Sequence, residues 1–599
     1  MSEKRDIVWI FTFEYAGIVK VGGLGEVPAN QAKHIADNFE ITVFIPSHGQ
    51  LDNLKNEYEW EKLPFNCVGQ INPSIFGLNE PESNYSISFH KSKINNVNIV
   101  LLAGENSFTN RFLDDPAVYN PDTLSGKINL FSIGMRCYIE YLIDYRKDDL
   151  PRIIHIHDYH AVIPFIGIKQ ILTKNGLDVN SIITIHLLTW PRYDINFFRG
   201  CGIDRTPIKV QLKNGHNLLN LREIFDLCKK NSPLNEMDQI PTVEKVGAVV
   251  CDIVTTVSQS YLISDIIPNC GKDLIEFKSD FIWDGCDWDY LEIYQEVIDK
   301  HGDEIRLFLD IPIEKKLSLP DMKKYLLTHK IAHLDKSPLI RSEKILNVIN
   351  EISNGNQFIK NGNVKAFKEM GPLVITTGRI SQQKGFETIF EAIPEVLKVI
   401  PNAKFLFLIL PTEYSLGEIK SYAQIVQKYS DNLRIIFGVA KDIFHLAHIS
   451  ADVYCALSRW EPFGIIALEA MSLKLPIIAT RVGGFQETII DVRSFSEIGT
   501  GILIEKDNPS QFAKALISLF LLAEISKRMK NENSIYEQET LNMVNQIPDE
   551  ILKSLVLLNP SFYHKIKENC YKRVENNFRW SKVSKKLISL YIKIKENQY

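Results

Sequence analysis

The sequence predicts an α/β fold built from two Rossmann-like, doubly wound domains that face each other across a cleft, with helical insertions. The chain has 599 residues, and a single hydrophobic core stops growing near roughly 250–300 residues, so two large domains are expected. Short β-branched apolar runs alternate with longer helical patterns in two separate series. Because these runs are almost continuously apolar, each strand is expected to be buried on both faces, as in a parallel sheet between helices.

The predicted strands share this apolar, β-branched character. In the first series they are IVWIFTF (7–13), ITVFIP (41–46), VNIVLLAG (97–104), IIHIH (153–157), SIITIH (181–186) and IVTTVS (253–258). In the second series they are LVITTG (373–378), FLFLIL (405–410), LRIIFG (433–438), VYCALS (453–458), PIIAT (476–480) and GILIE (501–505). Two such series predict two doubly wound domains.

The regions outside the two series are helical and charged, with few strand candidates. The expected segments are an N-terminal Rossmann-like domain at 1–265, a helical insertion and interdomain linker at 266–370, a second Rossmann-like domain at 371–575, and a C-terminal helix at 576–599 that crosses back to the first domain. A second polar helical insertion is expected at 524–562.

Composition and charge narrow the class of protein. The 45% hydrophobic and 24% charged residues are typical of a globular protein, and the formal charge of −5 gives no electrostatic reason to expect nucleic acid or membrane partners. Nine single cysteines without a C-x-x-C pair favour a reducing compartment. No apolar stretch reaches the ~18 residues of a membrane span, and no signal-peptide pattern is present. We therefore expect a cytoplasmic protein.

A glycine loop follows the first predicted strand. The strand runs into Glu14, and the loop then reads Lys20, Val, Gly22, Gly23, Leu, Gly, Glu before a helix. Glycines at this position let backbone N–H groups approach a phosphate or sugar, and a helix N-terminus favours negative charge. The alternative is a tight turn without a ligand. Lys20 favours an anion or sugar site, although the loop is not a dinucleotide-binding motif.

Histidines follow the strand at 153–157. The segment from His155 to His160 reads H-I-H-D-Y-H, and Asp158 lies where a ligand cleft would open. Contact of Asp158 with a sugar is one interpretation. A hydrogen-bonding role within the fold and a metal site are the alternatives, and the order of residues matches the H-x-H-x-D-H pattern of metallohydrolases poorly. His186 ends the next strand, where a structural role and a catalytic role are equally compatible with the sequence.

Two cations follow the first strand of the second series. Arg379 and Lys384 lie five residues apart on a turn that enters a helix. Such a pair can bind the oxygens of a diphosphate, because arginine offers bidentate geometry and lysine a mobile point charge. A departing diphosphate needs this stabilisation most in the transition state.

Paired glutamates form the most informative segment, S-R-W-E-P-F-G-I-I-A-L-E. Glu461 follows the strand at 453–458, Gly464 opens a helix, and Glu469 lies inside that helix. Carboxylates accept hydrogen bonds from vicinal hydroxyls, so the pair can hold a hexose and a ribose. Downstream, Gly483 and Gly484 supply another glycine turn at a strand end.

Taken together, these segments resemble the glycogen and starch synthase family. KVGGLGE is similar to the family's K-x-G-G-L-G-D loop, HIHDYH to H-x-H-D-W-H, TTVSQSY to T-T-V-S-P-x-Y, and DGCD (284–287) to N-G-I-D. GRISQQKG matches G-R-x-x-x-Q-K-G, and FRWSKVSKKLISLY resembles the closing helix. The resemblance covers nearly the whole chain in order, apart from the two helical insertions. It implies the GT-B fold of glycosyltransferases, with an acceptor domain followed by a nucleotide-sugar-binding domain.

The resemblance also implies roles for individual residues. Arg379 and Lys384 would bind the donor diphosphate, and Glu461 would hold the transferred glucose. His186 would contact that sugar and Asp158 would orient the sugar or the acceptor. The remaining donor-site and substrate-site positions would be Lys20, Gly22, Gly23, Gly464, Glu469, Gly483 and Gly484, with Glu469 on the nucleotide ribose.

The expected function is retaining transfer of glucose from ADP-glucose or UDP-glucose to the non-reducing end of an α-1,4-glucan, without a metal or cofactor. Four departures leave the donor base open: Phe463 stands where bacterial members usually have Cys, Glu469 stands where they commonly have Tyr, Glu26 replaces Asp, and Asp284 replaces Asn. A retaining transferase with a small acceptor, giving a trehalose-type or sucrose-type product, is one alternative. A zinc hydrolase using the 155–160 cluster and a catalytically silent glucan-binding protein are the others. Oligomeric state and regulation are not determined by the sequence.

Overall fold

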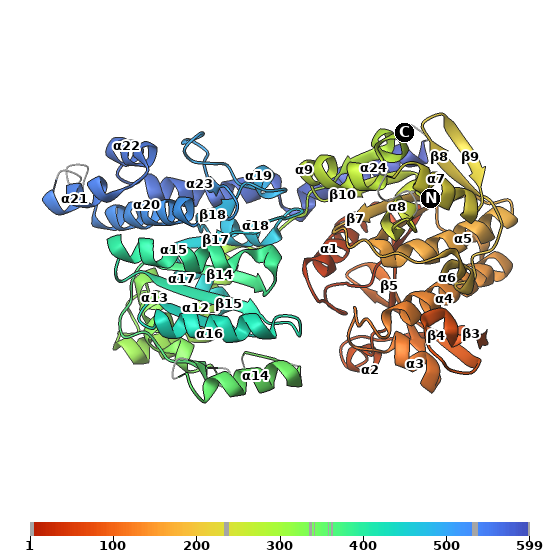
Figure 1. Ribbon diagram of the computed structural model, residues 1–599, viewed down its shortest axis with the longest axis horizontal. Coiled ribbons are helices and arrows are strands. Elements are labelled where there is room, and N and C mark those ends of the chain that lie inside the picture. Colours follow the sequence, from red (N-terminus) through yellow and green to blue (C-terminus); the bar gives the residue numbers. More distant parts are fainter. Residues whose placement is uncertain are drawn as a thin grey trace. The chain divides into compact units, whose positions relative to one another are not determined.

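The computed structural model (Figure 1) divides into two compact units, each with its own sheet. It describes residues 5–232, 239–334, 338–340, 342–356, 359–360, 363–529 and 537–596. Unit 1 comprises Met1–Gly285 with Trp580–Tyr599, and unit 2 comprises Cys286–Arg579. The expected insertion at 266–370 is therefore divided, since 266–285 belong to unit 1 and the remainder to unit 2. The reason is β11 (Ser279–Phe281), which extends the sheet of unit 1 by pairing with β10 (Ile253–Thr256).

The sheet of unit 1 has nine strands in the order β11-β10-β7-β6-β1-β2-β5-β4-β3. The remaining strands are β1 (Ile7–Phe11), β2 (Glu40–Pro46), β3 (Glu61–Ile71), β4 (Ser83–Ile94), β5 (Val97–Gly104), β6 (Ile153–His157) and β7 (Asn180–Ile185). The strands from β11 to β5 are parallel, whereas β4 and β3 are antiparallel. These last two strands were not predicted, because they contain many polar residues and lie at the sheet edge.

Strand β1 shows why the sheet needs helices on both faces. Ile7, Trp9 and Phe11 belong to one buried hydrophobic cluster, and Val8 and Ile10 belong to another. Successive strand residues point to opposite faces, so a strand that is apolar throughout is buried on both. The helices of unit 1 are α1 (Glu26–Ile35), α2 (Leu51–Leu54), α3 (Ser107–Leu113), α4 (Leu124–Tyr145), α5 (Val162–Lys174), α6 (Ile195–Gly200), α7 (Leu221–Lys230), α8 (Val243–Val250), α9 (Gln259–Tyr261), α10 (Ile267–Cys270) and α11 (Lys272–Ile275). A hairpin of β8 (Ile208–Leu212) and β9 (Gly215–Leu219) precedes α7.

The last helix, α24 (Trp580–Lys595), is part of unit 1. Its apolar residues Leu587, Leu590, Tyr591 and Ile594 share a cluster with β1 and α1. Two of its lysines make ion pairs with unit 1, Lys586 with Asp280 and Lys595 with Asp6, each at 2.7 Å. The helix therefore completes the core of a unit that begins more than 500 residues earlier in the chain.

Unit 2 has a six-stranded parallel sheet in the order β16-β15-β14-β17-β18-β19. Its strands are β14 (Leu373–Arg379), β15 (Lys404–Leu410), β16 (Leu433–Phe437), β17 (Val453–Ala456), β18 (Ile477–Thr480) and β19 (Gly501–Ile504). Each corresponds to a predicted strand of the second series. Renumbered along the chain, the order is 3-2-1-4-5-6, which is the Rossmann order.

Unit 2 also contains the inserted helices. They are α12 (Tyr290–Leu309), α13 (Leu319–Thr328) and α14 (Glu343–Ser353), followed by the short hairpin β12 (Ile359–Lys360) and β13 (Asn363–Val364). The buried Lys323 of α13 bonds to Asp452 at the start of β17 and fixes this insertion to the sheet.

The other helices of unit 2 are α15 (Phe386–Val399), α16 (Leu416–Lys428), α17 (Phe444–Ser450), α18 (Ile465–Ser472), α19 (Phe485–Thr488), α20 (Pro509–Arg528), α21 (Gln538–Gln546), α22 (Glu550–Leu558) and α23 (Phe562–Asn577). Within the insertion expected at 524–562, residues 530–536 lie outside the described residues. Among the described helices, none is long and apolar enough to cross a membrane.

Candidate active site

The strand order of each unit indicates where a ligand would bind. In each sheet the order of the parallel strands changes direction at one point. This switch point lies between β1 and β6 in unit 1 and between β14 and β17 in unit 2. Ligands of open α/β sheets bind beyond the carboxyl ends of the strands at such a switch point. The predicted residues follow these four strands: the loop with Lys20, Gly22 and Gly23 after β1, Asp158 after β6, Arg379 at the end of β14, and Glu461 after β17.

In unit 2 the structure brings Lys384 and Glu461 together. The Lys384 ammonium donates to Glu461 Oε2 at 2.7 Å, and the Ser458 hydroxyl donates to the same oxygen at 2.9 Å. The side chains of the pair are only 17% and 10% exposed, so the ion pair is largely shielded from solvent. A carboxylate fixed in this way keeps its second oxygen available for sugar hydroxyls, and the adjacent ammonium can stabilise a departing phosphate.

Arg379 differs from Lys384 in being unpaired. It is exposed at the carboxyl end of β14, and within the described part of the chain its guanidinium makes no hydrogen bond or ion pair. The Lys384 side chain lies over the neighbouring Gly378, since a Cβ atom placed there would lie 3.6 Å from Lys384 Cε. The two cations therefore project from one short turn, and Arg379 is free to bind a diphosphate.

The three predicted glycines of unit 2, Gly464, Gly483 and Gly484, have a packing role. A Cβ atom on Gly483, which has φ +42°, would lie 1.9 Å from the Glu461 carbonyl oxygen. The Gly484 N–H donates to that same carbonyl at 3.0 Å. Gly464, with φ +90°, leaves room for the Phe485 ring, which a Cβ atom would meet at 2.3 Å. These glycines hold the backbone of Glu461 in place.

Glu469 occupies the second turn of α18 and is half-buried. Burial, and then the nearby charge of Glu469, raise the pKa of the Cys286 thiol to about 12. Its predicted role on a ribose stays a prediction.

In unit 1 the glycine loop folds around Glu14. The buried carboxylate of Glu14 accepts from the N–H groups of Val21 at 2.6 Å and Gly22 at 2.9 Å, and from the Tyr119 hydroxyl at 2.5 Å. The Gly22 N–H therefore points to a protein carboxylate, in contrast to the expectation that it faces a ligand. Sequence analysis placed Glu14 only at a strand end. The signal in the sequence was an acidic residue at the end of an apolar strand, a few residues before a glycine loop.

The other two loop positions are also occupied by local contacts. Lys20 donates to Glu26 Oε1 at 2.5 Å, and both side chains remain partly exposed. Gly23 begins the short 3-10 turn Gly23–Gly25 that leads into α1. A substrate anion would compete with Glu26 for Lys20.

Asp158 and His186 meet at the carboxyl ends of β6 and β7. Asp158 Oδ1 accepts from the His186 N–H at 2.7 Å, and His186 Nε2 lies 2.9 Å from His157 Nδ1. Burial, reinforced by the Glu244 charge, raises the pKa of Asp158 to about 8, whereas burial lowers the pKa of His186 to about 3. The His186 imidazole is therefore neutral near pH 7, and the backbone N–H of His186 contacts the Asp158 carboxyl group, whose protonated form burial favours.

The backbone of Asp158 is strained, with φ +59° and ψ 178°. A non-glycine residue in this region costs of order 1–3 kcal/mol and is typical of functional sites. Sequence analysis missed Glu244, which is fully buried and accepts from the Thr189 and Trp190 N–H groups at 3.0 Å. It holds the loop that follows His186.

The histidine cluster does not form a metal site. Both ring nitrogens of His155 are engaged, Nδ1 with the Tyr591 hydroxyl at 2.8 Å and Nε2 with the Thr184 hydroxyl at 2.7 Å. Among the described residues, no group of three or more His, Cys, Asp or Glu side chains is arranged to hold a metal ion. His155 is a structural residue, and the zinc hydrolase alternative lacks its ligand set.

Arg459, to which the sequence pattern gave no role, connects the turn after β14 with the turn after β17. Its guanidinium donates to the Gln382 carbonyl and to Asp507, at 2.6 and 2.7 Å. Its backbone N–H donates to the Gln383 carbonyl at 2.7 Å. Gln382 and Gln383 precede Lys384 in the same short turn, so Arg459 fixes the segment that presents Lys384 to Glu461.

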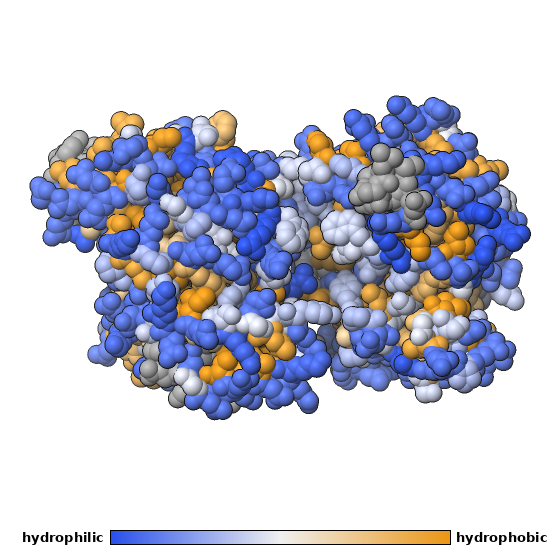
Figure 2. All heavy atoms as spheres, viewed as in Figure 1, coloured by the Kyte–Doolittle hydropathy of each residue, from blue (hydrophilic) through white to orange (hydrophobic). Residues whose placement is uncertain are grey.

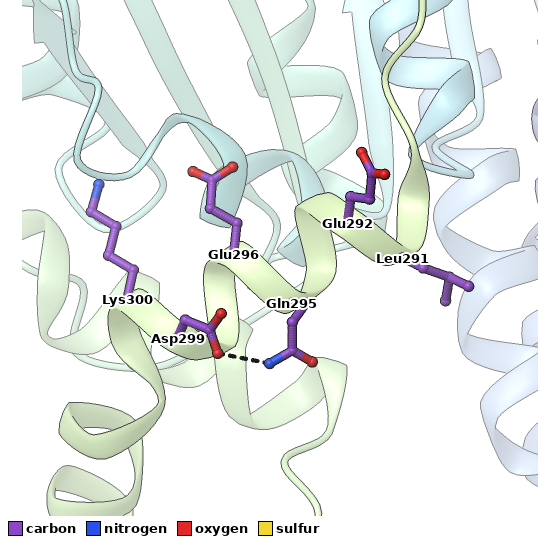
Figure 3. A pocket seen from close by; sticks show the side chains of 6 residues that line it. All are labelled: Leu291, Glu292, Gln295, Glu296, Asp299 and Lys300. Atoms are coloured by element: carbon purple, nitrogen blue, oxygen red, sulfur yellow. Dashed lines mark hydrogen bonds between the residues drawn. The ribbon is translucent and has the colours of Figure 1, made fainter.

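A separate hollow lies along α12 (Figure 3), and none of the predicted site residues lines it. Its lining side chains are Leu291, Glu292, Gln295, Glu296, Asp299 and Lys300, all from one helix. Gln295 bonds to Asp299 at 2.7 Å and Lys300 pairs with Asp442 at 3.3 Å. The groups do not converge on a common point, and hydrophilic residues dominate the visible surface of unit 2 (Figure 2). The hollow is an open helix surface.

Two family models match the chain in succession. The starch synthase catalytic domain matches residues 7–269, and the group 1 glycosyl transferases match residues 358–534. Glycogen synthases of Protochlamydia amoebophila and Oceanobacillus iheyensis are each 22% identical to this chain. These alignments cover 80% and 86% of this chain and 84% and 90% of the relatives. The chain belongs to the glycogen and starch synthase family.

A local match and a solved structure agree with this family membership. A probable glycogen synthase of Methanocaldococcus jannaschii is 34% identical over 119 residues, which are 20% of this chain and 22% of that protein. The catalytic domain of Starch Synthase IV from Arabidopsis thaliana, solved with ADP and acarbose, has a TM-score of 0.59 at 15% identity and covers 99% of this chain and 100% of its own. The predicted GT-B fold with two Rossmann-like domains is confirmed, and the chain is a glycosyltransferase enzyme of the synthase type.

Proposed function

We propose that this enzyme transfers glucose from ADP-glucose or UDP-glucose to the non-reducing end of an α-1,4-glucan, with retention of configuration. The observation that supports this proposal most is the shielded Lys384–Glu461 pair at the switch point of unit 2, beside the unpaired Arg379. It provides one carboxylate for a hexose and two cations for a diphosphate.

In the proposed mechanism, Arg379 and Lys384 bind the diphosphate and stabilise the charge that develops as the glycosidic bond breaks. Glu461 holds the hydroxyls of the glucosyl group. The departing phosphate helps to deprotonate the incoming 4-hydroxyl. The proposed mechanism therefore uses no pair of carboxylates as acid and nucleophile, unlike that of a glycosidase. The two cations take the place of a metal ion, so turnover is expected to survive a chelator.

The test is a product assay with the two donors side by side. ADP-glucose and UDP-glucose are each incubated with a glycogen primer and, separately, with free glucose. Extension of glycogen with α-1,4 linkages supports the proposal and identifies the donor base. A disaccharide formed from free glucose, without extension of glycogen, would instead assign a small-acceptor transferase.

The variant Glu461→Ala examines the residue role in the same assay. Loss of the hexose contact and of the partner of Lys384 should reduce kcat by about 100-fold or more, since charged hydrogen bonds contribute about 1.5–3 kcal/mol each. Glu391→Ala, an exposed glutamate of α15, is the matched control and should retain wild-type turnover. Turnover of Glu461→Ala within a few-fold of wild type would refute the role.

A further inference from the structure

Unit 1 contains a second concave site that the transfer reaction does not use. It is a cavity of about 280 Å³ between α6, the loop that follows it and the start of α7. Ligand pockets typically measure about 300–1,000 Å³, so this volume suits a small metabolite. Three of its lining residues are arginines, Arg199, Arg205 and Arg222.

These three guanidinium groups lack partners. Within the described part of the chain, none of them makes a hydrogen bond or ion pair, and all three are exposed. Of the other described arginines of unit 1, all but the exposed Arg152 are paired, as Arg111 is with Glu80 at 2.7 Å. The carboxylate of Asp204, which also lines the cavity, is already bound to Lys174. The cavity therefore has an excess of positive charge, and like charges that converge on one space repel unless an anion enters it.

The loop that bears Arg205 is held rigidly. Gln170 is buried at 1% exposure, and its side-chain amide donates to the carbonyls of Asp204 at 3.1 Å and Thr206 at 2.8 Å. Its side-chain oxygen accepts from the Asp204 N–H at 3.1 Å. Three hydrogen bonds from one buried side chain therefore fix the residues on both sides of Arg205.

The two helices that flank the loop are also fixed at their first turns. Asn220 accepts from the N–H groups of Arg222 at 3.0 Å and Glu223 at 3.2 Å, and Glu223 accepts from the Asn220 N–H at 2.7 Å. In α6, Asp194 accepts from the Phe197 N–H at 2.8 Å. The backbone that carries the three arginines is therefore held in place, which reduces the entropy lost when an anion binds.

We propose that this cavity binds a phosphate monoester, with the phosphate on Arg199, Arg205 and Arg222. Arginine is suited to phosphate because its planar fork donates two parallel hydrogen bonds. The space beside the arginines is lined by Asp204 and Asn220, whose oxygen and amide groups can accept from and donate to hydroxyls. A phosphorylated sugar matches both the charge and the polar wall. The site lies in unit 1, whereas the proposed diphosphate cations Arg379 and Lys384 lie in unit 2.

The binding test uses the full chain with saturating ADP and UDP, which occupy the proposed donor site. Calorimetric titrations compare a hexose 6-phosphate, inorganic phosphate and the free hexose. We expect the hexose phosphate to bind and its affinity to fall as salt increases, while the free hexose does not bind. If inorganic phosphate binds as tightly as the hexose phosphate, the phosphate group alone is recognised. Absence of binding by both phosphates, or equal binding of the free hexose, would overturn the proposal.

Variants locate the binding within the chain. Arg199→Gln, Arg205→Gln and Arg222→Gln should each weaken binding of the hexose phosphate tenfold or more, with unchanged thermal unfolding and unchanged glucosyl transfer in the absence of the ligand. Arg152→Gln is the matched control, because Arg152 is an exposed arginine of unit 1 that does not line the cavity. Arg379→Gln should leave this binding intact. Unchanged binding in all three cavity variants, or equal loss in Arg152→Gln, would contradict the assignment.

Discussion

Individual residues at the two switch points are held in unusual states. Glu461 is paired with Lys384 in a shielded position, and its backbone is confined by glycines that tolerate no side chain. Asp158 is buried, strained and close to Glu244. Residues with a shifted pKa or a strained backbone cluster at functional sites. Two predictions follow from single residues.

The first concerns stability as a function of pH. Asp158 ionises near 3.8 when unperturbed, and burial raises its pKa to about 8 in the folded chain. Between these values the folded state keeps a proton that the unfolded state has lost, so the stability contributed by this group falls as pH rises from about 4 to about 8. Asp158→Asn does not ionise and can still accept from the His186 N–H.

We therefore expect the melting temperature of Asp158→Asn, relative to that of the wild type, to increase as pH rises from 5 to 8.5. Calorimetry measures this difference. Asp303→Asn, an exposed position on α12, is the control and should follow the wild type. A constant difference between Asp158→Asn and the wild type across this range would show that Asp158 is ionised throughout.

The second residue-scale prediction concerns Gly483. In Gly483→Ala the new methyl group would displace the Glu461 carbonyl, from which it would lie at 1.9 Å. If Glu461 binds the hexose as proposed, moving its carboxylate by about 1 Å is expected to lower kcat by about 100-fold. Gly417→Ala serves as the control, because nothing lies within 4 Å of a Cβ atom there. If Gly483→Ala has the kcat of the wild type, the geometry of this turn does not affect catalysis.

At the scale of elements, the proposed donor site of unit 2 depends on how the turn after β14 is joined to the turn after β17. Arg459 makes this connection through the carbonyls of Gln382 and Gln383 and through Asp507. No residue of the predicted set does so. Arg459 acts through Lys384 and is therefore a positioning residue.

Arg459→Lys keeps the charge but loses the planar fork that reaches Gln382 and Asp507 together. We expect KM for the nucleotide sugar to rise about 10-fold or more, since one charged hydrogen bond is worth about 1.5–3 kcal/mol, with a smaller effect on kcat. KM for the glucan should not change. Arg528→Lys, whose exposed ion pairs lie on α20, is the control. An unchanged donor KM would exclude the positioning role.

At the scale of the whole molecule, unit 1 is not complete until the end of the chain. Helix α24 supplies four apolar residues to a cluster with β1, and the Tyr591 hydroxyl meets the buried His155 at 2.8 Å. The stability of unit 1 therefore depends on residues from both ends of the sequence.

Tyr591→Phe examines this dependence. It leaves His155 Nδ1 buried without a partner, which costs about 1–3 kcal/mol, so we expect the melting temperature of the full chain to fall by a few degrees. Tyr145→Phe, at a tyrosine that is 75% exposed, should melt as the wild type does. An unaltered melting temperature in Tyr591→Phe would mean that this hydrogen bond adds nothing to the stability of unit 1.

The sequence by itself determined the two parallel sheets, because the continuous apolar strands of 373–378 and 405–410 have no other stable environment than a sheet buried on both faces. The sequence also predicted Lys384 and Glu461 as residues of one site, and the structure places their charged groups 2.7 Å apart. The polar hairpin of β3 and β4 escaped prediction because edge strands need little apolar sequence.

Only the tertiary structure decided which partners the predicted residues have. Gly22 donates to Glu14, His155 bonds to Tyr591, and Gly483 packs on Glu461. In each case the two residues come from separate elements, and their contact depends on how those elements pack. Local periodicity and motif spacing describe each element alone, so hydrogen bonds and close contacts between distant segments are fixed by packing.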